Sequence, residues 1–565
     1  MQKYLISGAI VLAAFGGFTG TAIANDGHAV TATAEAAATA DEGRLEADVN
    51  FLADDSLEGR EAGSATYAMA AGYVAGQFAA IGVKQGGDNG TYFQNVPLIT
   101  GKSTGAEDAG LILTGKDLPD DLAFGDDFVS YGKIGTSGEI EGELVFVGFG
   151  FAAEGYEQND FEGVDLKGKI AVVLRGAPSG LNSEERAHFR STQNERLSER
   201  GAIGRMMLFT PKSSAQFPFS VVKRFVSGST SMNWATPEGT SFSSSPNIQA
   251  SAILSPELSE KLFEGQQVSW EDLTKFEADE LASVASFDMG VTAKVSWGST
   301  SELTTSPNVV GYIPGTDPAL ADEYVIVTAH LDHTGVDDDH GTYPEPKDGE
   351  EEAPELIDSL NNGAMDNATG TASMLEVARL MVNNPARRPI LFVALTAEEK
   401  GLVGSDYMAR NPLPMGGKPV ANINLDMPIV TYELKDVVAF GAERSTMIGP
   451  IEAAVEAAGM KLSPDPVPEQ GLFTRSDQYS FVQQGVPSLF LVTGHGGDGA
   501  AAQADFLENH YHKPSDEVGL IDFTQLKRFT DVNHDITRSV ANMDERPVWL
   551  KGDFFGKSFG GEMQE

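Results

Sequence analysis

The length of 565 residues, with 41% hydrophobic and 8% aromatic content, is enough to bury the cores of about two to four globular domains. The 82 acidic and 39 basic residues give a formal net charge of −43, which opposes non-specific attraction to nucleic acid or to anionic membranes. The sequence contains no cysteine, so disulfide bonds and lipid-modified cysteines are excluded.

The N-terminus has the pattern of a secretory signal. Lys3 precedes an apolar run from Tyr4 to Phe18 and the small-x-small triplet that ends at Ala24. This run is shorter than the ~20 residues that span a bilayer, so cleavage after Ala24 is favoured over a membrane anchor. We therefore expect a signal peptide (1–24), a flexible Ala/Thr-rich linker (25–41), and a periplasmic or secreted protein without a membrane segment after cleavage.

The rest of the chain is predicted to combine two kinds of domain. Residues 42–135 form the N-terminal part of the main domain and have a helical pattern up to Gly82, a helix cap. Residues 136–298 hold short apolar strands, divided by a Ser-rich stretch, which indicates an inserted β-rich domain. Residues 299–545 form the C-terminal part of the main domain, and residues 546–565 form a C-terminal tail.

After Pro307 the pattern is one of continuous apolar strands that alternate with helices. Four strands are apolar on both faces, namely 324–329, 390–395, 420–425 and 489–492. Strands of this kind occur in parallel sheets that helices cover on both sides. The predicted fold class is therefore α/β, a mostly parallel sheet sandwiched by helices, with a β-rich domain inserted before it.

Polar residues that can bind metal ions lie near the carboxyl ends of these strands, where open α/β sheets bind their ligands. They are His330, Asp332, Asp366, Glu398, Glu399, Asp426 and His512. Each alone has an ordinary structural explanation, such as a helix cap or a solvated surface. Packing gives no reason for all of them to gather at strand ends, so together they predict a metal centre.

The donor types suit two zinc ions that share one carboxylate. With one Asp shared, five ligands give each ion two terminal ligands: His330, Asp366, Glu399, Asp426 and His512. Glu398 is left over, as an uncoordinated general base requires. Asp332, two residues after His330, is placed to hold the far ring nitrogen of that histidine.

Six motifs carry a family resemblance: TAHLDH, GAMDNATG, LTAEEKGLVGS, NINLDM, RSDQYSF and YHKPSDE. With them the chain resembles the co-catalytic di-zinc aminopeptidases and glutamate carboxypeptidases, a family that also contains the transferrin receptor and the glutaminyl cyclases. A further resemblance is to the protease-associated (PA) domain of many members, and it is carried by VFVGFGF followed by DLKGKIAVVLRG. We therefore assign a PA domain to residues 136–298. The resemblance covers nearly the whole mature chain.

The resemblance implies a role for each site residue. One zinc ion is held by His330 and Asp426, the other by Glu399 and His512, and Asp366 bridges the two. Glu398 is the general base. Tyr511, immediately before the last ligand, is the candidate to stabilise the oxyanion of the tetrahedral intermediate.

The chain departs from the family pattern at three places. An acidic segment, residues 337–358, lengthens the connection between the first two ligands, and we hypothesise that it lies near the site entrance. His510 rivals His512 as a ligand, although the Pro-Ser-Asp-Glu after His512 matches the family. Gln478 stands where many relatives have His, which puts the substrate contacts in doubt.

The predicted function is that of an exported, zinc-dependent aminopeptidase, a hydrolase with peptides as its partners. The acidic segment favours this activity because it attracts a cationic amine. A glutamate carboxypeptidase shares the same metal site and stays an alternative, with Arg475 or Arg60 as the clamp for a substrate carboxylate. The complete ligand set disfavours a receptor-like protein without catalysis and a one-zinc glutaminyl cyclase.

Overall fold

The computed structural model describes residues 39–565, apart from 116–117, 119–120, 179, 229, 279–283, 337–357, 412 and 414–415. The predicted signal peptide, most of the predicted linker and nearly all of the acidic segment lie outside the described residues. None of the helices in the described part is long and apolar enough to cross a lipid bilayer.

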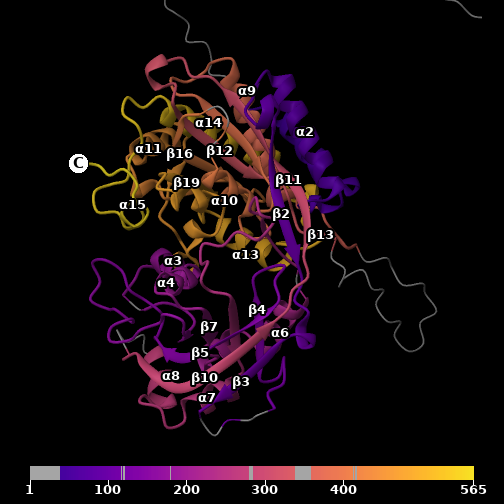
Figure 1. Ribbon diagram of the computed structural model, residues 1–565. Coiled ribbons are helices and arrows are strands. Elements are labelled where there is room, and N and C mark those ends of the chain that lie inside the picture. The colour runs from indigo at the N-terminus through magenta and orange to yellow at the C-terminus, as the bar shows by residue number, and fades with distance from the viewer. Residues whose placement is uncertain are drawn as a thin grey trace, which may run out of the picture. The chain divides into compact units, whose positions relative to one another are not determined.

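Two sheets organise the described residues (Figure 1). In the described part, the larger sheet has ten strands in the order β18-β17-β19-β16-β12-β15-β11-β2-β8, with β1 paired to β11. Its strands are β1 (Lys84–Gln85), β2 (Phe93–Gly101), β8 (Ser231–Trp234), β11 (Glu302–Ile313), β12 (Glu323–His330), β15 (Ile390–Leu395), β16 (Lys418–Leu425), β17 (Asp436–Phe440), β18 (Lys461–Leu462) and β19 (Ser488–Thr493). The central strands β19, β16, β12 and β15 are parallel, whereas β11, β2 and β8 are antiparallel. The predicted α/β class with a mostly parallel sheet is confirmed at the centre of this sheet.

Helices cover both faces of the larger sheet. On β12, Val325 and Val327 enter one core with side chains of α9 and α14, whereas Ile326 enters a second core with side chains of α10 and α12. This alternation explains why the central strands are apolar at nearly every position. The helices of this part are α1 (Glu42–Leu52), α2 (Ala65–Ile81), α9 (Thr369–Val382), α10 (Val403–Arg410), α11 (Ile448–Ala457), α12 (Gln478–Val482), α13 (Gly499–Asn509), α14 (Phe523–Ala541) and α15 (Phe554–Ser558).

The predicted N-terminal helical pattern corresponds to two helices, α1 and α2. Gly82 ends α2 in the left-handed conformation, at φ 94°, as expected. The chain turns between α1 and α2 at Glu58 and Gly59, both of which have positive φ. A Cβ on Gly59 would lie 2.4 Å from the carbonyl oxygen of Asn361, so only glycine allows this turn to approach the loop that precedes α9.

The smaller sheet has its own core. In the described residues it contains seven strands: β3 (Gly110–Thr114), β4 (Phe128–Gly132), β5 (Gly138–Phe146), β6 (Ile170–Val173), β7 (Gly204–Met207), β9 (Ala250–Leu254) and β10 (Phe287–Trp297). Its helices are α3 (Ser183–Ser191), α4 (Gln193–Glu199), α5 (Pro211–Gln216), α6 (Phe219–Gly228), α7 (Pro256–Phe263) and α8 (Trp270–Ala278). Phe146, Met206 and Phe263 belong to one buried cluster in this sheet.

Two features of the smaller sheet differ from the predicted boundaries. Strands β3 and β4 pair with β10 and β9, so this sheet begins before residue 136. The Ser-rich stretch separates β7 and β9 in sequence, as predicted, but it contains β8, which pairs with β2 at the edge of the larger sheet. Short edge strands such as β8 have little sequence signal of their own because their partners come from distant segments. The assignment of this region as a PA domain stays a prediction.

The C-terminal residues 546–565 pack into the protein. The side chains of Trp549 and Phe555 are fully buried, in a cluster with Phe473 and Tyr479. This segment therefore contributes to the hydrophobic core of the main domain.

Candidate metal centre

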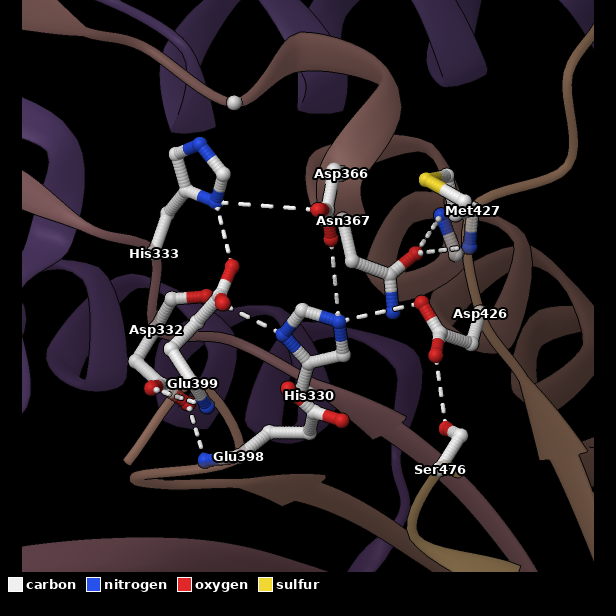
Figure 2. Close-up of polar contacts among 12 residues, drawn as sticks. His330, Asp332, His333, Asp366, Asn367, Glu398, Glu399, Asp426, Met427 and Ser476 are labelled. Carbon is white, nitrogen blue, oxygen red and sulfur yellow. Dashed lines mark hydrogen bonds and ion pairs between the residues drawn. The ribbon is translucent and has the colours of Figure 1, made fainter. Parts of the chain in front are cut away.

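The five predicted ligands meet beyond the carboxyl ends of the central parallel strands. Figure 2 shows four of them, His330, Asp366, Glu399 and Asp426. His330 is the last residue of β12, Asp426 directly follows β16, and Glu399 lies in the turn after β15. Asp366 lies in the turn before α9, and His512 lies in the loop between α13 and α14. Parallel strands bring their carboxyl ends to one edge, which explains why residues far apart in sequence meet here.

One group of donors surrounds the ring of His330. Its Nε2 atom lies 3.0 Å from Oδ1 of Asp426 and 3.2 Å from Oδ1 of Asp366. Two donors on one tetrahedral zinc ion, with bonds of ~2.0 Å, lie roughly 3.3 Å apart. The three residues thus fit a single ion, and His330 and Asp366 are buried.

A second group of donors surrounds the ring of His512. Its Nε2 atom lies 3.2 Å from Oδ2 of Asp366 and 3.1 Å from Oε2 of Glu399. The two oxygens of Asp366 therefore face two different donor groups, as a bridging carboxylate requires. The rival His510 lies outside both groups, because its Nδ1 contacts Ser515 instead.

The electrostatics of the two groups favour added positive charge. Burial opposes protonation of His512, but its bonds to Asp366 and Glu399 outweigh burial and raise the pKa of His512 to about 10. Burial likewise opposes protonation of His330, yet Asp426 and Asp366 raise its pKa well above the ordinary value. Clustered carboxylates that draw protons onto imidazoles are a suitable environment for divalent cations.

Asp332 has a different role from the one predicted. Its main-chain oxygen, rather than its carboxylate, lies 3.1 Å from Nδ1 of His330. The buried carboxylate accepts hydrogen bonds from the main-chain N–H groups of Glu398 and Glu399, at 3.1 and 3.3 Å. The spacing of two residues puts the main chain, not the side chain, next to the ring, and leaves the carboxylate free to hold the turn after β15.

Three further residues support the ligands. Ser476 Oγ donates a 2.6 Å hydrogen bond to Oδ2 of Asp426, and the carboxylate of Asp516 accepts from the main-chain N–H groups of Met365 and Asp366. His333 Nδ1 lies 2.7 Å from Oε1 of Glu399. His333 and Asp516 lie within motifs that carry ligands, and Ser476 lies within RSDQYSF, which carries none. The motifs reveal their presence, but not which ligand each one contacts.

A cavity of about 470 Å³ borders both donor groups and also Glu398, Tyr511 and Arg475. Its remaining wall is largely apolar and includes Met427, Ile429, Leu472, Phe490, Val492 and Leu507. Burial raises the pKa of Glu398 well above the range of an exposed glutamate and raises that of Tyr511, so the Tyr511 hydroxyl stays protonated.

Arg60 does not line this cavity, contrary to its suggested role as a carboxylate clamp. The guanidinium is buried and donates hydrogen bonds to main-chain carbonyl oxygens, including those of Leu331 and Gly363 at 2.9 and 3.0 Å. Arg60 therefore ties the N-terminal segment to the loops of the site and has no free donor facing a substrate.

The family profile of "Peptidase family M28" matches residues 308–537, which include all five predicted ligands and Glu398. These residues are a peptidase family M28 domain. The resemblance inferred from the motifs is thereby confirmed.

Curated relatives of the M28 domain include Aminopeptidase YwaD of Bacillus subtilis (strain 168), 27% identical over 204 residues, which are 35% of this chain and 42% of the relative. Aminopeptidase NAALADL1 of Mus musculus is 33% identical over 152 residues, 26% of this chain and 16% of the relative. The matches thus span less than half the length of both relatives.

Among solved structures, an aminopeptidase from Aneurinibacillus sp. strain AM-1 is 19% identical, with 88% of this chain and 93% of that chain covered and a TM-score of 0.45. BSAP, a zinc aminopeptidase from Bacillus subtilis, is 18% identical, with 88% and 94% covered and a TM-score of 0.41.

Proposed function

We propose that this protein is an exported metallopeptidase that binds two zinc ions and removes N-terminal residues from peptides. One observation carries the proposal: the two oxygens of Asp366 face separate donor groups beside a cavity that Glu398 also borders. The M28 match and the aminopeptidase names of YwaD and NAALADL1 support a peptidase of this kind. A probable zinc metalloprotease of Pyrenophora tritici-repentis, 38% identical over 65 residues, supports zinc as the metal. Export rests on the pattern of the first 24 residues.

The two donor groups support this ligand set. One ion would be held by His330, Asp426 and Asp366, and the other by Glu399, His512 and Asp366. When bound, zinc ions polarise the scissile carbonyl group and lower the pKa of water towards ~7.

Glu398 and Tyr511 perform the proton transfer and charge stabilisation. Glu398 takes a proton from the attacking water and delivers it to the leaving amine, and burial, which raises the pKa of Glu398, makes it a stronger base. The protonated hydroxyl of Tyr511 donates a hydrogen bond to the carbonyl oxygen as negative charge develops there. Asp332 holds the turn that carries Glu398, because its carboxylate accepts hydrogen bonds from two main-chain N–H groups.

The cavity wall favours substrates whose N-terminal residue has an apolar side chain. Ile429, Phe490 and Val492 offer apolar surface beside the donor groups, and burial of a leucine or phenylalanine side chain there contributes about 1.5–3 kcal/mol. A charged side chain would lose hydration against this apolar part of the wall.

A glutamate carboxypeptidase is the second candidate, because Arg475 borders the cavity and is exposed. Three peptides separate the two activities: Leu-Gly-Gly, acetyl-Leu-Gly-Gly and acetyl-Ala-Glu, assayed with bound zinc measured by mass spectrometry. We expect hydrolysis of the first peptide alone, by protein with two zinc ions per chain. Release of glutamate from acetyl-Ala-Glu, abolished in Arg475→Gln, would replace the aminopeptidase assignment with the carboxypeptidase.

A further inference from the structure

A second cavity, of about 560 Å³, lies against the smaller sheet and shares no lining residue with the cavity of the metal centre. Its floor is one face of β4, β7 and β9, and helix α6 forms part of its wall. Arg205 and Met207 alternate along β7 and so lie on the same face. Met207 pairs with Ile253 of β9, which also lines the cavity. The volume is that of a small-molecule site, which ranges over about 300–1,000 Å³.

Most of the lining of this cavity is apolar. Phe209, Phe217 and Val222 line it together with Met207 and Ile253. Phe225 of α6 also lines it and is 66% exposed. When an apolar ligand covers such an exposed aromatic side chain, the burial of its apolar surface favours binding.

Two arginines interrupt the apolar lining. Arg205 donates a 2.8 Å hydrogen bond from Nη2 to the hydroxyl of Tyr131, but its buried Nε has no hydrogen-bond partner among the described residues. Arg175 stacks on the ring of Phe217 at 4.4 Å and donates from Nη1 to Gln216. Within the described part of the chain, neither guanidinium has a carboxylate within ion-pair distance, although the sequence contains 82 acidic residues. A guanidinium that lines an apolar cavity without a carboxylate partner favours a ligand that brings an anion.

We propose that this cavity binds a monocarboxylate with an apolar body, its carboxylate against Arg205 and its body against the apolar wall. A planar carboxylate matches the donor geometry of a guanidinium, and the bond is strong where water is excluded. Medium-chain fatty acids have this chemistry, and so does the C-terminus of a peptide that ends in an apolar residue. This binding site is independent of the metal centre and of the activity proposed for it.

The test is calorimetric titration of the full mature protein with decanoate, decanol and the pair acetyl-Leu-Phe and acetyl-Leu-Phe amide. We expect decanoate to bind and decanol to bind at least about tenfold more weakly, because decanol lacks the charge. Arg205→Gln should weaken decanoate binding by at least about tenfold. The matched control Arg224→Gln removes an exposed arginine of α6 that does not line the cavity, and it should bind decanoate like the wild type.

Circular dichroism and peptidase activity show whether each variant is folded, since neither arginine belongs to the metal centre. Binding of acetyl-Leu-Phe but not of its amide or of decanoate identifies a peptide C-terminus as the natural source of the carboxylate. Equal binding of decanoate and decanol, equal binding by wild type and Arg205→Gln, or no binding of either carboxylate would overturn the proposal.

Discussion

His333 Nδ1 lies 2.7 Å from Oε1 of Glu399 (Figure 2). Oε2 of the same carboxylate lies 3.1 Å from Nε2 of His512. The 2.7 Å distance is that of a hydrogen bond and is shorter than the roughly 3.3 Å between two donors on one zinc ion. Nε2 of His333 is buried and has no hydrogen-bond partner in the described part of the chain. A buried N–H group without an acceptor is costly, so the proton belongs on Nδ1. We infer that His333 orients Glu399 and is not itself a ligand.

Replacement of His333 by Ala should therefore lower the affinity for one zinc ion and leave the affinity for the other unchanged. Loss of a residue that orients a ligand lowers metal affinity by about 10–100-fold, and the ion at Glu399 should show this loss. Competition with a chromophoric chelator measures both affinities, and His510→Ala, outside both donor groups, is the matched control. Complete loss of one ion at saturating zinc would instead make His333 a ligand, and unchanged affinities would remove it from the site.

Glu398→Gln should separate metal binding from catalysis. Glu398 belongs to neither donor group, so both zinc ions should be retained, as mass spectrometry of the purified variant would show. The amide cannot accept the proton from water, and kcat should fall by at least the ~10²-fold that a general base contributes. A variant that turns over at nearly the wild-type rate would assign the base to another residue.

The catalytic strands and the ligands were predictable because they depend on local patterns. Residues 390–395 are apolar at every position, and the polar residues that follow must lie at the same sheet edge as those after the neighbouring parallel strands. Contacts between distant side chains were not predictable. The sequence shows that Asp332 is close to His330, but not that its carboxylate turns towards the amides of Glu398 and Glu399.

The same limit applies to Arg60 and to β8. An arginine near a catalytic motif is equally consistent with binding a substrate carboxylate and with binding main-chain carbonyls, and only the packing of the N-terminal segment decides for the latter. The residues of β8 become a strand because β2 offers an unpaired edge, which is a property of the folded sheet rather than of the Ser-rich segment.

Asp366 and Asp426 should differ in the number of zinc ions that they control. Asp366→Ala removes the carboxylate that faces both donor groups, so both ions should be lost or loosened together. Asp426→Ala removes a donor of one group only and should leave the ion at Glu399 and His512 bound. Zinc content after dialysis against a weak chelator measures the difference. Two tightly held ions in Asp366→Ala would contradict the bridging role.

Zinc binding should release protons, because the histidines of the metal-free site are protonated at pH 7. The pKa of His512 is about 10 in the metal-free protein, and that of His330 is also raised well above its ordinary value. A metal ion needs the nitrogen lone pair that the proton occupies, so zinc affinity should rise with pH between 7 and about 10. Calorimetry at pH 7 in two buffers with different protonation enthalpies should give about two protons released when both ions bind, one from each histidine.

The same shifts set the pH dependence of the stability of the metal-free protein. The folded pKa of His512 lies above the ordinary value of 6.5, so its stabilising contribution is complete below pH 6.5 and is lost as the pH rises through about 10. Glu399 has a folded pKa of about 2, below the ordinary 4.5, because hydrogen bonds from His333 and His512 outweigh its burial. Its contribution is complete above pH 4.5 and is lost as the pH falls towards 2. The difference in Tm between metal-free wild type and His512→Ala should therefore be largest near pH 5.5, the middle of the window from 4.5 to 6.5, and should shrink at pH 10. A Tm difference that grows from pH 5.5 to pH 10 would contradict an ion pair between protonated His512 and ionised Glu399. Zinc binding without proton release would contradict it as well.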